Sequence, residues 1–229
     1  QLERMKVPEK VFQRFKLDAA GRTHLASMGI YLFRWEVLHE LLANTKFEDF
    51  GREVIPFAIK RKKVYGYFFD GYWEDIGTIR NFFEAHLDLT QPLPKFNLYD
   101  EKRPIFTHAR FLPGSKILSS EVYNSILCEG SIINRSRIIH SIIGVRSRIG
   151  DNSIIERSVI MGADFFESKE ELAKNAETGT PNIGVGYNCE IRNAIIDKNA
   201  RIGNGVRIIN ARGVKEEMTE EYVIQDGIV

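Results

Sequence analysis

Aliphatic residues recur at every sixth position in the second half of this sequence. The clearest run is Ile143, Ile149, Ile155 and Met161, and glycine follows three of these four residues. A six-residue period is typical of a parallel β-helix, in which each repeat forms one side of a coil and its aliphatic residue points into the core. Glycine has no Cβ, so it allows a tight turn toward the next side. The repeat therefore predicts the fold of this region before any functional residue is considered.

The same spacing extends in both directions from that run. Further aliphatic residues keep it at Leu127, Ile133, Ile139, Ile196, Ile202 and Ile208. Small side chains, including Ser147 and Ser153, occupy a second inward position four residues later. We predict a β-helix over residues 117–229, interrupted by an insertion at 162–182. Within the insertion, residues 168–174 (SKEELAK) have the pattern of a short helix with a capping box.

The first part of the chain has an α/β pattern. Apolar or alternating segments at 26–33 and 64–69 predict two strands, and the first of them is expected to be buried. Apolar residues at helical spacing predict helices at 35–44, 50–59 and 78–89. Two strands are too few for a complete doubly wound sheet, so we expect this part to be the end of a larger domain.

Residues 90–116 have the composition of a linker. They contain four prolines and few aliphatic residues, and we expect the aromatic residues Phe96, Tyr99 and Phe106 to anchor the segment to a surface. The boundary between the two domains is therefore predicted here, with one domain at 1–89 and the other at 117–229.

The overall composition excludes several classes of protein. A hydrophobic content of 43% supports two packed cores, and a net charge of +1 gives no general attraction for nucleic acid. No apolar run has the length of a membrane span. Cys128 and Cys189 lie far apart within expected strands, which favours reduced thiols over a disulfide or a metal site. We therefore expect a cytoplasmic protein, or a plastid protein in a plant, that binds neither membrane nor nucleic acid.

Six short motifs follow one another along the chain. They are ASMGIY at 26–31, DFG at 49–51, YWEDIGT at 72–78, PGSK at 113–116, MGADFFE at 161–167 and IIDKNARIG at 195–203. In this order they resemble glucose-1-phosphate adenylyltransferase, also called ADP-glucose pyrophosphorylase, and the cyanobacterial and plant branch in particular. The resemblance covers nearly the whole chain.

The resemblance implies a fold for each domain. Residues 1–89 correspond to the C-terminal part of a Rossmann-like nucleotidyltransferase domain, which binds the sugar phosphate. Residues 117–229 correspond to a left-handed parallel β-helix with hexapeptide repeats, which serves regulation and oligomerisation. The left hand is taken from the resemblance, because general crossover rules favour the right. The family's Gly-rich nucleotide loop and its Glu-Lys-Pro motif have no counterpart in residues 1–229, so this chain resembles a C-terminal half that we expect to be inactive alone.

The reaction implied by the resemblance joins ATP and glucose 1-phosphate into ADP-glucose and releases pyrophosphate, for glycogen or starch synthesis. The attacking phosphate is already ionised, so the protein must align two polyanions and offset their charge with Mg²⁺ and cationic side chains. Asp75 matches the family's catalytic, metal-binding aspartate. The local sequence alone favours another reading, in which Asp75 caps the helix that begins near Gly77.

Two further residues match substrate-binding positions of the family. Ser27 matches a contact to glucose 1-phosphate, although a serine in an apolar strand could equally bond to a neighbouring carbonyl group. Glu74 could contact sugar hydroxyls or orient the turn that carries Asp75, and the sequence leaves both roles open.

The family is also regulated by anionic effectors, a phosphorylated metabolite and phosphate. Arg110 and Lys198 match effector-binding positions, and His108 stands where the plant branch usually has glutamine. Solvated surface charge is the alternative for each of the two basic residues. The family is tetrameric, so the resemblance implies a homo- or heterotetramer, and we expect Ile142 and Ile195 on flat outer faces to pack against another subunit.

Two alternative functions remain open at this stage. Paralogous subunits of the family can lose catalysis and act as regulatory partners. Hexapeptide β-helices also form acyltransferases with a catalytic histidine, and His140 lies within the repeats. The YWEDIGT motif at 72–78 has no role in an acyltransferase.

Overall fold

The structure of the chain is a computed structural model. It describes residues 5–6, 11, 13, 24–43 and 46–229. The chain divides into two compact units, Gln1–Gly71 and Tyr72–Val229, which are described one after the other.

The described residues of the first unit include a pair of short strands and the helical segments between residues 35 and 59. Strand β1 (Met5–Lys6) pairs antiparallel with β2 (His24–Leu25). The helical segments are α2 (Trp35–Ala43), the π-helix η1 (Phe50–Val54) and α3 (Ile55–Ile59), which confirms the predicted helices at 35–44 and 50–59. A small core forms where Leu41, Val54 and Ala58 pack together, each no more than 2% exposed.

The two strands predicted in this unit are wrong. Residues 26–33 and 64–69 have no regular structure, and Leu32 and Tyr67 are 101% and 89% exposed. A strand requires a neighbouring strand for its backbone hydrogen bonds, and neither segment has one among the described residues. Both segments therefore have the apolar pattern of a strand but lack a neighbouring strand to pair with among the described residues.

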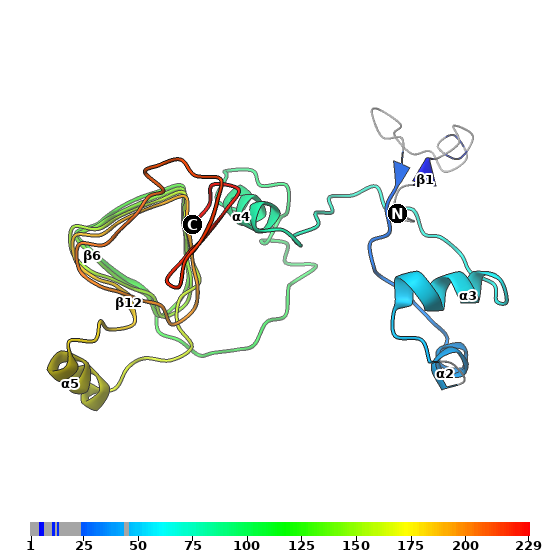
Figure 1. The fold of residues 1–229 in the computed structure, drawn as a ribbon, viewed down its shortest axis with the longest axis horizontal. Coiled ribbons are helices and arrows are strands. Elements are labelled where there is room, and N and C mark those ends of the chain that lie inside the picture. Colours follow the sequence, from blue (N-terminus) through cyan, green and yellow to red (C-terminus); the bar gives the residue numbers. More distant parts are fainter. Residues whose placement is uncertain (1–4, 7–10, 12, 14–23, 44–45) are drawn as a thin grey trace. The chain divides into compact units, whose positions relative to one another are not determined.

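The second unit confirms the parallel β-helix. Three parallel sheets form its three sides, seen end on as a triangle in Figure 1. The first sheet contains β3 (Lys116–Leu118), β6 (Ile132–Asn134), β9 (Arg148–Ile149), β12 (Gly184–Val185) and β15 (Arg201–Ile202). The second contains β4 (Glu121–Tyr123), β7 (Arg137–Ile139), β10 (Ile154–Glu156), β13 (Glu190–Arg192) and β16 (Arg207–Ile208). The third contains β5 (Ile126–Leu127), β8 (Ile142–Ile143), β11 (Val159–Ile160) and β14 (Ile195–Ile196).

The core consists of the aliphatic residues that set the sequence period. Ile133 pairs in register with Ile149, and Ile138 with Ile155, so equivalent side chains stack from coil to coil. These four residues are at most 1% exposed. Gly144 fits between two coils, because a Cβ there would collide with the carbonyl oxygen of Met161.

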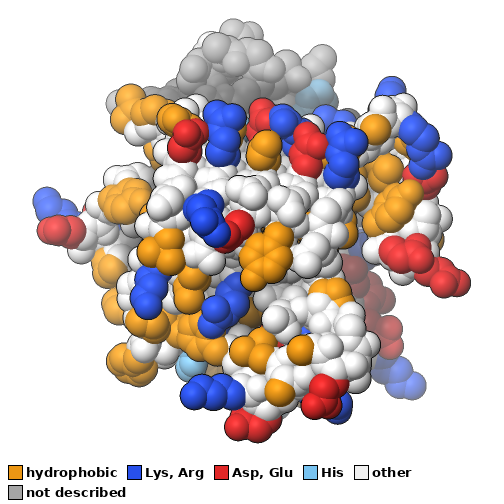
Figure 2. Space-filling view, turned by 90° about the vertical axis from the view of Figure 1, so that its left-hand side faces the viewer, with side chains coloured by type: hydrophobic (Ala, Val, Ile, Leu, Met, Phe, Trp, Pro, Cys, Tyr) orange, Lys and Arg blue, Asp and Glu red, His pale blue; other side chains and the backbone are white. Residues whose placement is uncertain are grey.

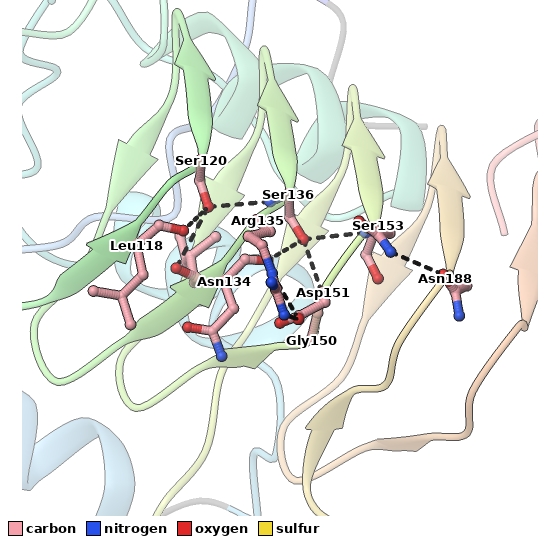
Figure 3. A network of polar contacts seen from close by, with 11 residues as sticks. Leu118, Ser120, Asn134, Arg135, Ser136, Gly150, Asp151, Ser153 and Asn188 are labelled. Atoms are coloured by element: carbon pink, nitrogen blue, oxygen red, sulfur yellow. Dashed lines mark hydrogen bonds and ion pairs between the residues drawn. The ribbon is translucent and has the colours of Figure 1, made fainter.

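Columns of small polar residues fill the inner corners beside this core (Figure 3). In one column the amide of Ser136 donates to Oγ of Ser120 at 3.1 Å, and the amide of Ser153 donates to Oγ of Ser136 at 3.1 Å. The amide of Cys189 continues the column by donating to Oγ of Ser153 at 3.1 Å. Each hydroxyl thus satisfies an amide of the next coil that the sheets leave without a partner.

Helix α4 (Ile79–Asp88) packs against the third sheet, which confirms the predicted helix at 78–89. Phe83 and Leu87 form a cluster with Val159 and Ile228 and are each 1% exposed. This helix belongs to the unit of the β-helix, whereas the sequence analysis placed it in a domain that ended at residue 89.

The docking of α4 corrects our expectation for Ile142 and Ile195. Ile142 is only 8% exposed, and Ile195 packs against the cluster that α4 forms. Ile142 is therefore buried within the chain and Ile195 packs beside α4, so neither lies on the open flat face that we expected.

The remaining segments are a linker, an insertion and a terminal hairpin. The linker has no helix or strand between α4 and β3, and Tyr99 and Phe106 are 83% and 92% exposed, so they are not the anchors that we expected. Helix α5 (Lys169–Thr178) lies in the insertion, and Ser168 and Glu171 form the predicted capping box. Strands β17 (Glu216–Met218) and β18 (Val223–Gln225) form a hairpin near the C-terminal end.

The outer surface of the β-helix carries mixed charges. Figure 2 shows Lys and Arg side chains interspersed with Asp and Glu on one face. Neighbouring coils are joined by ion pairs such as Arg137 with Glu121 and Arg207 with Glu190, both at 2.9 Å. Each helix in the described part of the chain is too short or too polar to cross a membrane.

Candidate functional site

The turn before α4 holds Asp75 in a defined conformation. The amide of Gly77 donates to Oδ1 of Asp75 at 3.0 Å, and Nδ2 of Asn81 donates to the backbone oxygen of Asp75 at 2.8 Å. A Cβ on Gly77 would lie only 3.0 Å from the same Oδ1, so glycine allows this close approach. The carboxylate is exposed, and no hydrogen bond between described residues engages its Oδ2.

Thr78, not Asp75, caps helix α4. The Thr78 side chain accepts a hydrogen bond from the amide of Asn81 at 3.2 Å, and Thr78 has the extended backbone of an N-cap residue. The structure therefore contradicts the reading in which Asp75 caps this helix. It leaves Oδ2 of Asp75 available for a ligand.

The chemistry of this carboxylate fits Mg²⁺. A magnesium ion is usually held by one or two carboxylates, with substrate phosphates and water as the other ligands. Among the described residues no group of three or more His, Cys, Asp and Glu could hold a metal ion, so an all-protein site is absent from that part of the chain. A single carboxylate such as that of Asp75 can serve the kind of site that is completed by substrate phosphates and water.

Helix α4 connects this turn to the β-helix. Its apolar face is buried through Phe83 and Leu87, and Nη2 of Arg80 donates to the backbone oxygen of Asp226 at 3.1 Å. Asn81 therefore links the turn to α4, and the apolar face of α4 is packed on the β-helix. The packing of α4 on the β-helix thus determines where Asp75 lies.

The other two expected substrate residues are both exposed. Oγ of Ser27 accepts from the amide of Gly29 at 3.2 Å and lies 3.4 Å from the hydroxyl oxygen of Tyr31. Ser27 is therefore not inside a buried strand, and its expected carbonyl partner is replaced by these two groups. Glu74 borders a cavity beside α4. Ser27 and Glu74 belong to different units of the structure.

The three expected effector residues do not form one cluster of free cations. Nη1 of Arg110 donates to the backbone oxygen of His108 at 3.3 Å, and both residues are exposed. Nζ of Lys198 forms an ion pair with Oδ1 of Asp164 at 2.8 Å. Hydrogen bonds from Lys198 and Asn199 hold the pKa of the Asp164 carboxyl below its usual value, so this partner of Lys198 stays ionised at neutral pH.

The two cysteines are free thiols, as the sequence predicted. Burial raises the pKa of Cys128, with a smaller contribution from the charge of Glu129. The thiol therefore stays protonated at neutral pH, which is typical of an unreactive cysteine.

Sequence reasoning missed a polar group that the structure brings together between α4 and the β-helix. Oγ1 of Thr90 lies 2.8 Å from Nδ1 of His140, and Arg157 pairs with Glu84 at 3.6 Å. Burial lowers the pKa of His140, the positive charge of Arg157 lowers it further, and Glu84 opposes both. The spacing of His140 and Arg157 in the sequence could have indicated that they are neighbours, because it equals one coil of the β-helix.

The structure shows a parallel β-helix preceded by a turn that carries an exposed carboxylate. Both parts of the chain match known protein families. Residues 10–92 match the family described as nucleotidyl transferase, and residues 110–229 match the family described as GLGC left-handed parallel beta-helix domain. The second match covers more than half of the chain, so the protein belongs to the GLGC left-handed β-helix family. The two domains in this order fit a glucose-1-phosphate adenylyltransferase-like protein.

Proposed function

We propose that this chain is part of a glucose-1-phosphate adenylyltransferase, which makes ADP-glucose and pyrophosphate from ATP and glucose 1-phosphate. The observation that carries the proposal is the exposed carboxylate of Asp75, which lies within the matched nucleotidyl transferase segment and keeps Oδ2 available. A nucleotidyltransferase needs a hard oxygen ligand for its metal. Gly77 holds Oδ1 of Asp75 and Asn81 holds the backbone oxygen of Asp75, which leaves Oδ2 for the metal.

In this proposal Asp75 holds Mg²⁺, which neutralises charge on the phosphates when it is bound. The turn from Tyr72 to Thr78 keeps the carboxylate at one position, and Asn81 ties that position to α4. Ser27 and Glu74 contact the glucose 1-phosphate. No residue has to act as a strong base, because the attacking phosphate oxygen is already ionised.

We also propose regulation through the β-helix, in a homo- or heterotetramer. Arg110, with His108 beside it, supplies one cationic contact for a phosphorylated metabolite or for phosphate. Lys198 supplies another after it exchanges its ion pair with Asp164 for the effector. The side chain of Lys198 is 41% exposed, so water screens the pair and the exchange costs little.

The test compares Asp75→Asn with the wild-type sequence in the longest polypeptide that the gene encodes. Formation of ADP-glucose from ATP and glucose 1-phosphate is followed at several concentrations of Mg²⁺. We expect Asp75→Asn to reduce turnover at least about 100-fold, or about 2.7 kcal/mol of barrier, because the amide is a poorer metal ligand. Asp100→Asn is the matched control, since Asp100 pairs with Arg103 in the linker and should be neutral.

Each other outcome contradicts part of the proposal. Full activity of Asp75→Asn would refute the role of Asp75. A wild-type polypeptide that binds phosphate but makes no ADP-glucose would instead be a catalytically silent regulatory subunit. We expect His140→Asn to leave ADP-glucose formation largely intact. A wild-type polypeptide that transfers an acyl group and loses this activity in His140→Asn, with the fold preserved, would favour the acyltransferase alternative.

A further inference from the structure

A polar cavity of about 350 Å³ lies where α4 meets one corner of the β-helix. Its volume is at the lower end of the range for small-molecule sites, which is about 300–1,000 Å³. The side chains that carry its chemistry are Tyr72, Glu74, Glu84, Asp88, His140 and Arg157. All of them belong to the unit that contains the β-helix. Asp75 is not among the residues that line this cavity.

His140 is held in one orientation by Thr90. The hydroxyl of Thr90 donates its single proton to the backbone oxygen of Leu87 at 2.7 Å. Its contact of 2.8 Å with Nδ1 of His140 therefore requires the histidine to donate. The lowered pKa keeps the imidazole neutral at pH 7, so Nε2 is a hydrogen-bond acceptor. No hydrogen bond between described residues engages Nε2.

Arg157 stands one coil further along the same corner and is also held from several sides. Its Nε donates to Oδ1 of Asn193 at 3.1 Å, and its Nη2 lies 3.6 Å from a carboxylate oxygen of Glu84. The guanidinium carbon lies 5.9 Å from the ring centre of Phe83. The side chain is still 42% exposed, so it retains N–H groups for a ligand.

The charges of the lining exclude a polyanion as the preferred ligand. Glu74, Glu84 and Asp88 are three carboxylates, and they outnumber the two cations Arg157 and Lys95 while His140 is neutral. A phosphate group would therefore meet net negative charge.

The same side chains suit hydroxyl groups, each of which both donates and accepts a hydrogen bond. The carboxylates and Nε2 of His140 accept, and Arg157 donates. Tyr72 adds an aromatic ring for the apolar face of a ligand. We propose that this cavity binds an uncharged carbohydrate of one or two sugar rings. The site shares Glu74 with the proposed contact to glucose 1-phosphate, but it does not include Asp75.

The other residues in the corner column of His140 and Arg157 indicate which substitutions should preserve the fold. His140 and Arg157 occupy a corner column in which every residue has a positive φ between 41° and 50°. The other members of the column are Asn124, Asn193 and Asn210. Asparagine tolerates this left-handed conformation better than most residues. His140→Asn and Arg157→Asn therefore remove the two ligand contacts while the backbone keeps a residue that the corner favours.

The experiment follows amide and imidazole resonances by nuclear magnetic resonance while glucose or maltose is added. We expect saturable shifts for His140, Arg157 and Glu84, and a dissociation constant at least tenfold weaker in His140→Asn and in Arg157→Asn. Arg135→Asn is the matched control, because Arg135 has a φ of 37° at another corner and does not line the cavity. Its affinity should equal that of the wild type.

The proposal is overturned if neither sugar shifts these resonances at 50 mM, about fifty times the millimolar scale of weak binding. It is also overturned if inorganic phosphate or spermidine binds there more tightly than the sugars, because the ligand would then be an ion. Equal loss of affinity in Arg135→Asn would attribute the effect to the β-helix as a whole and would likewise refute the site.

Discussion

Replacing Ser136 with alanine tests whether the serine column stabilises the β-helix. Ser136 is 3% exposed, and its hydroxyl contacts the backbone oxygens of Asn134 and Gly150, both at 2.7 Å. It also accepts from the amide of Ser153, which is only 1% exposed. Ser136→Ala therefore removes one donated hydrogen bond and leaves a buried amide without its acceptor.

The magnitude follows from these two losses. A buried donor left unsatisfied costs about 1–3 kcal/mol, and the lost donation costs about 1 kcal/mol more. We expect Ser136→Ala to lower the free energy of unfolding by about 2–4 kcal/mol. Urea denaturation gives the global value, and hydrogen exchange of the Ser153 amide reports the local effect.

Two variants define the outcome. Ser168→Ala removes an exposed cap of α5 outside the column, so it should leave the unfolding midpoint of the β-helix unchanged. Ser136→Cys should lose less stability than Ser136→Ala, because Cys189 shows that a thiol fits at an equivalent position of this column. A change below about 0.5 kcal/mol in Ser136→Ala, with normal protection at Ser153, would refute the reasoning.

Three further predictions concern other parts of the structure. Leu87→Ala should cost about 2–5 kcal/mol in urea denaturation, because it leaves a cavity between α4 and the β-helix; a loss below 1 kcal/mol would show that α4 is not docked. Asn81→Ala should increase hydrogen exchange of the Gly77 amide at least about tenfold, or 1.4 kcal/mol of protection, while the amide of Phe83 stays protected. Folding favours neutral His140, whose pKa is lowered mainly by burial, so stability should fall as the pH decreases below the ordinary histidine value of about 6.5. His140→Asn should flatten this dependence of unfolding on pH, and an unchanged slope would contradict it.

Predictions from the sequence were confirmed where the pattern lay within one short segment or one repeat, and they failed where the structure depended on a distant segment. Ile149 and Ile155 were placed in the core because each coil repeats the environment of the previous one. The helix at 78–89 was predicted from its own amphipathic face. The strands at 26–33 and 64–69 failed because a strand depends on a partner that its own residues do not specify.

The candidate site shows the same division. The turn around Asp75 was recognisable, because its motif is continuous in the sequence. The contact between Thr90 and His140 joins residues 50 positions apart, and no periodic pattern relates a linker residue to a corner of the β-helix. The cavity beside α4 could therefore be found only after the helix was placed.

The spacing along the serine column has a consequence for altering this protein. Ser136 and Ser153 are 17 residues apart, whereas Ser153 and Cys189 are 36 apart, yet both pairs make the same hydrogen bond at 3.1 Å. The extra chain, with α5, leaves and rejoins the β-helix at one corner. Glu167 closes its base by bonding to the amide of Ile183 and to Arg201. We therefore expect that a fluorescent label or a peptide attached within residues 169–178 would leave the neighbouring coils in place, because the contacts of Glu167 hold the base of the insertion.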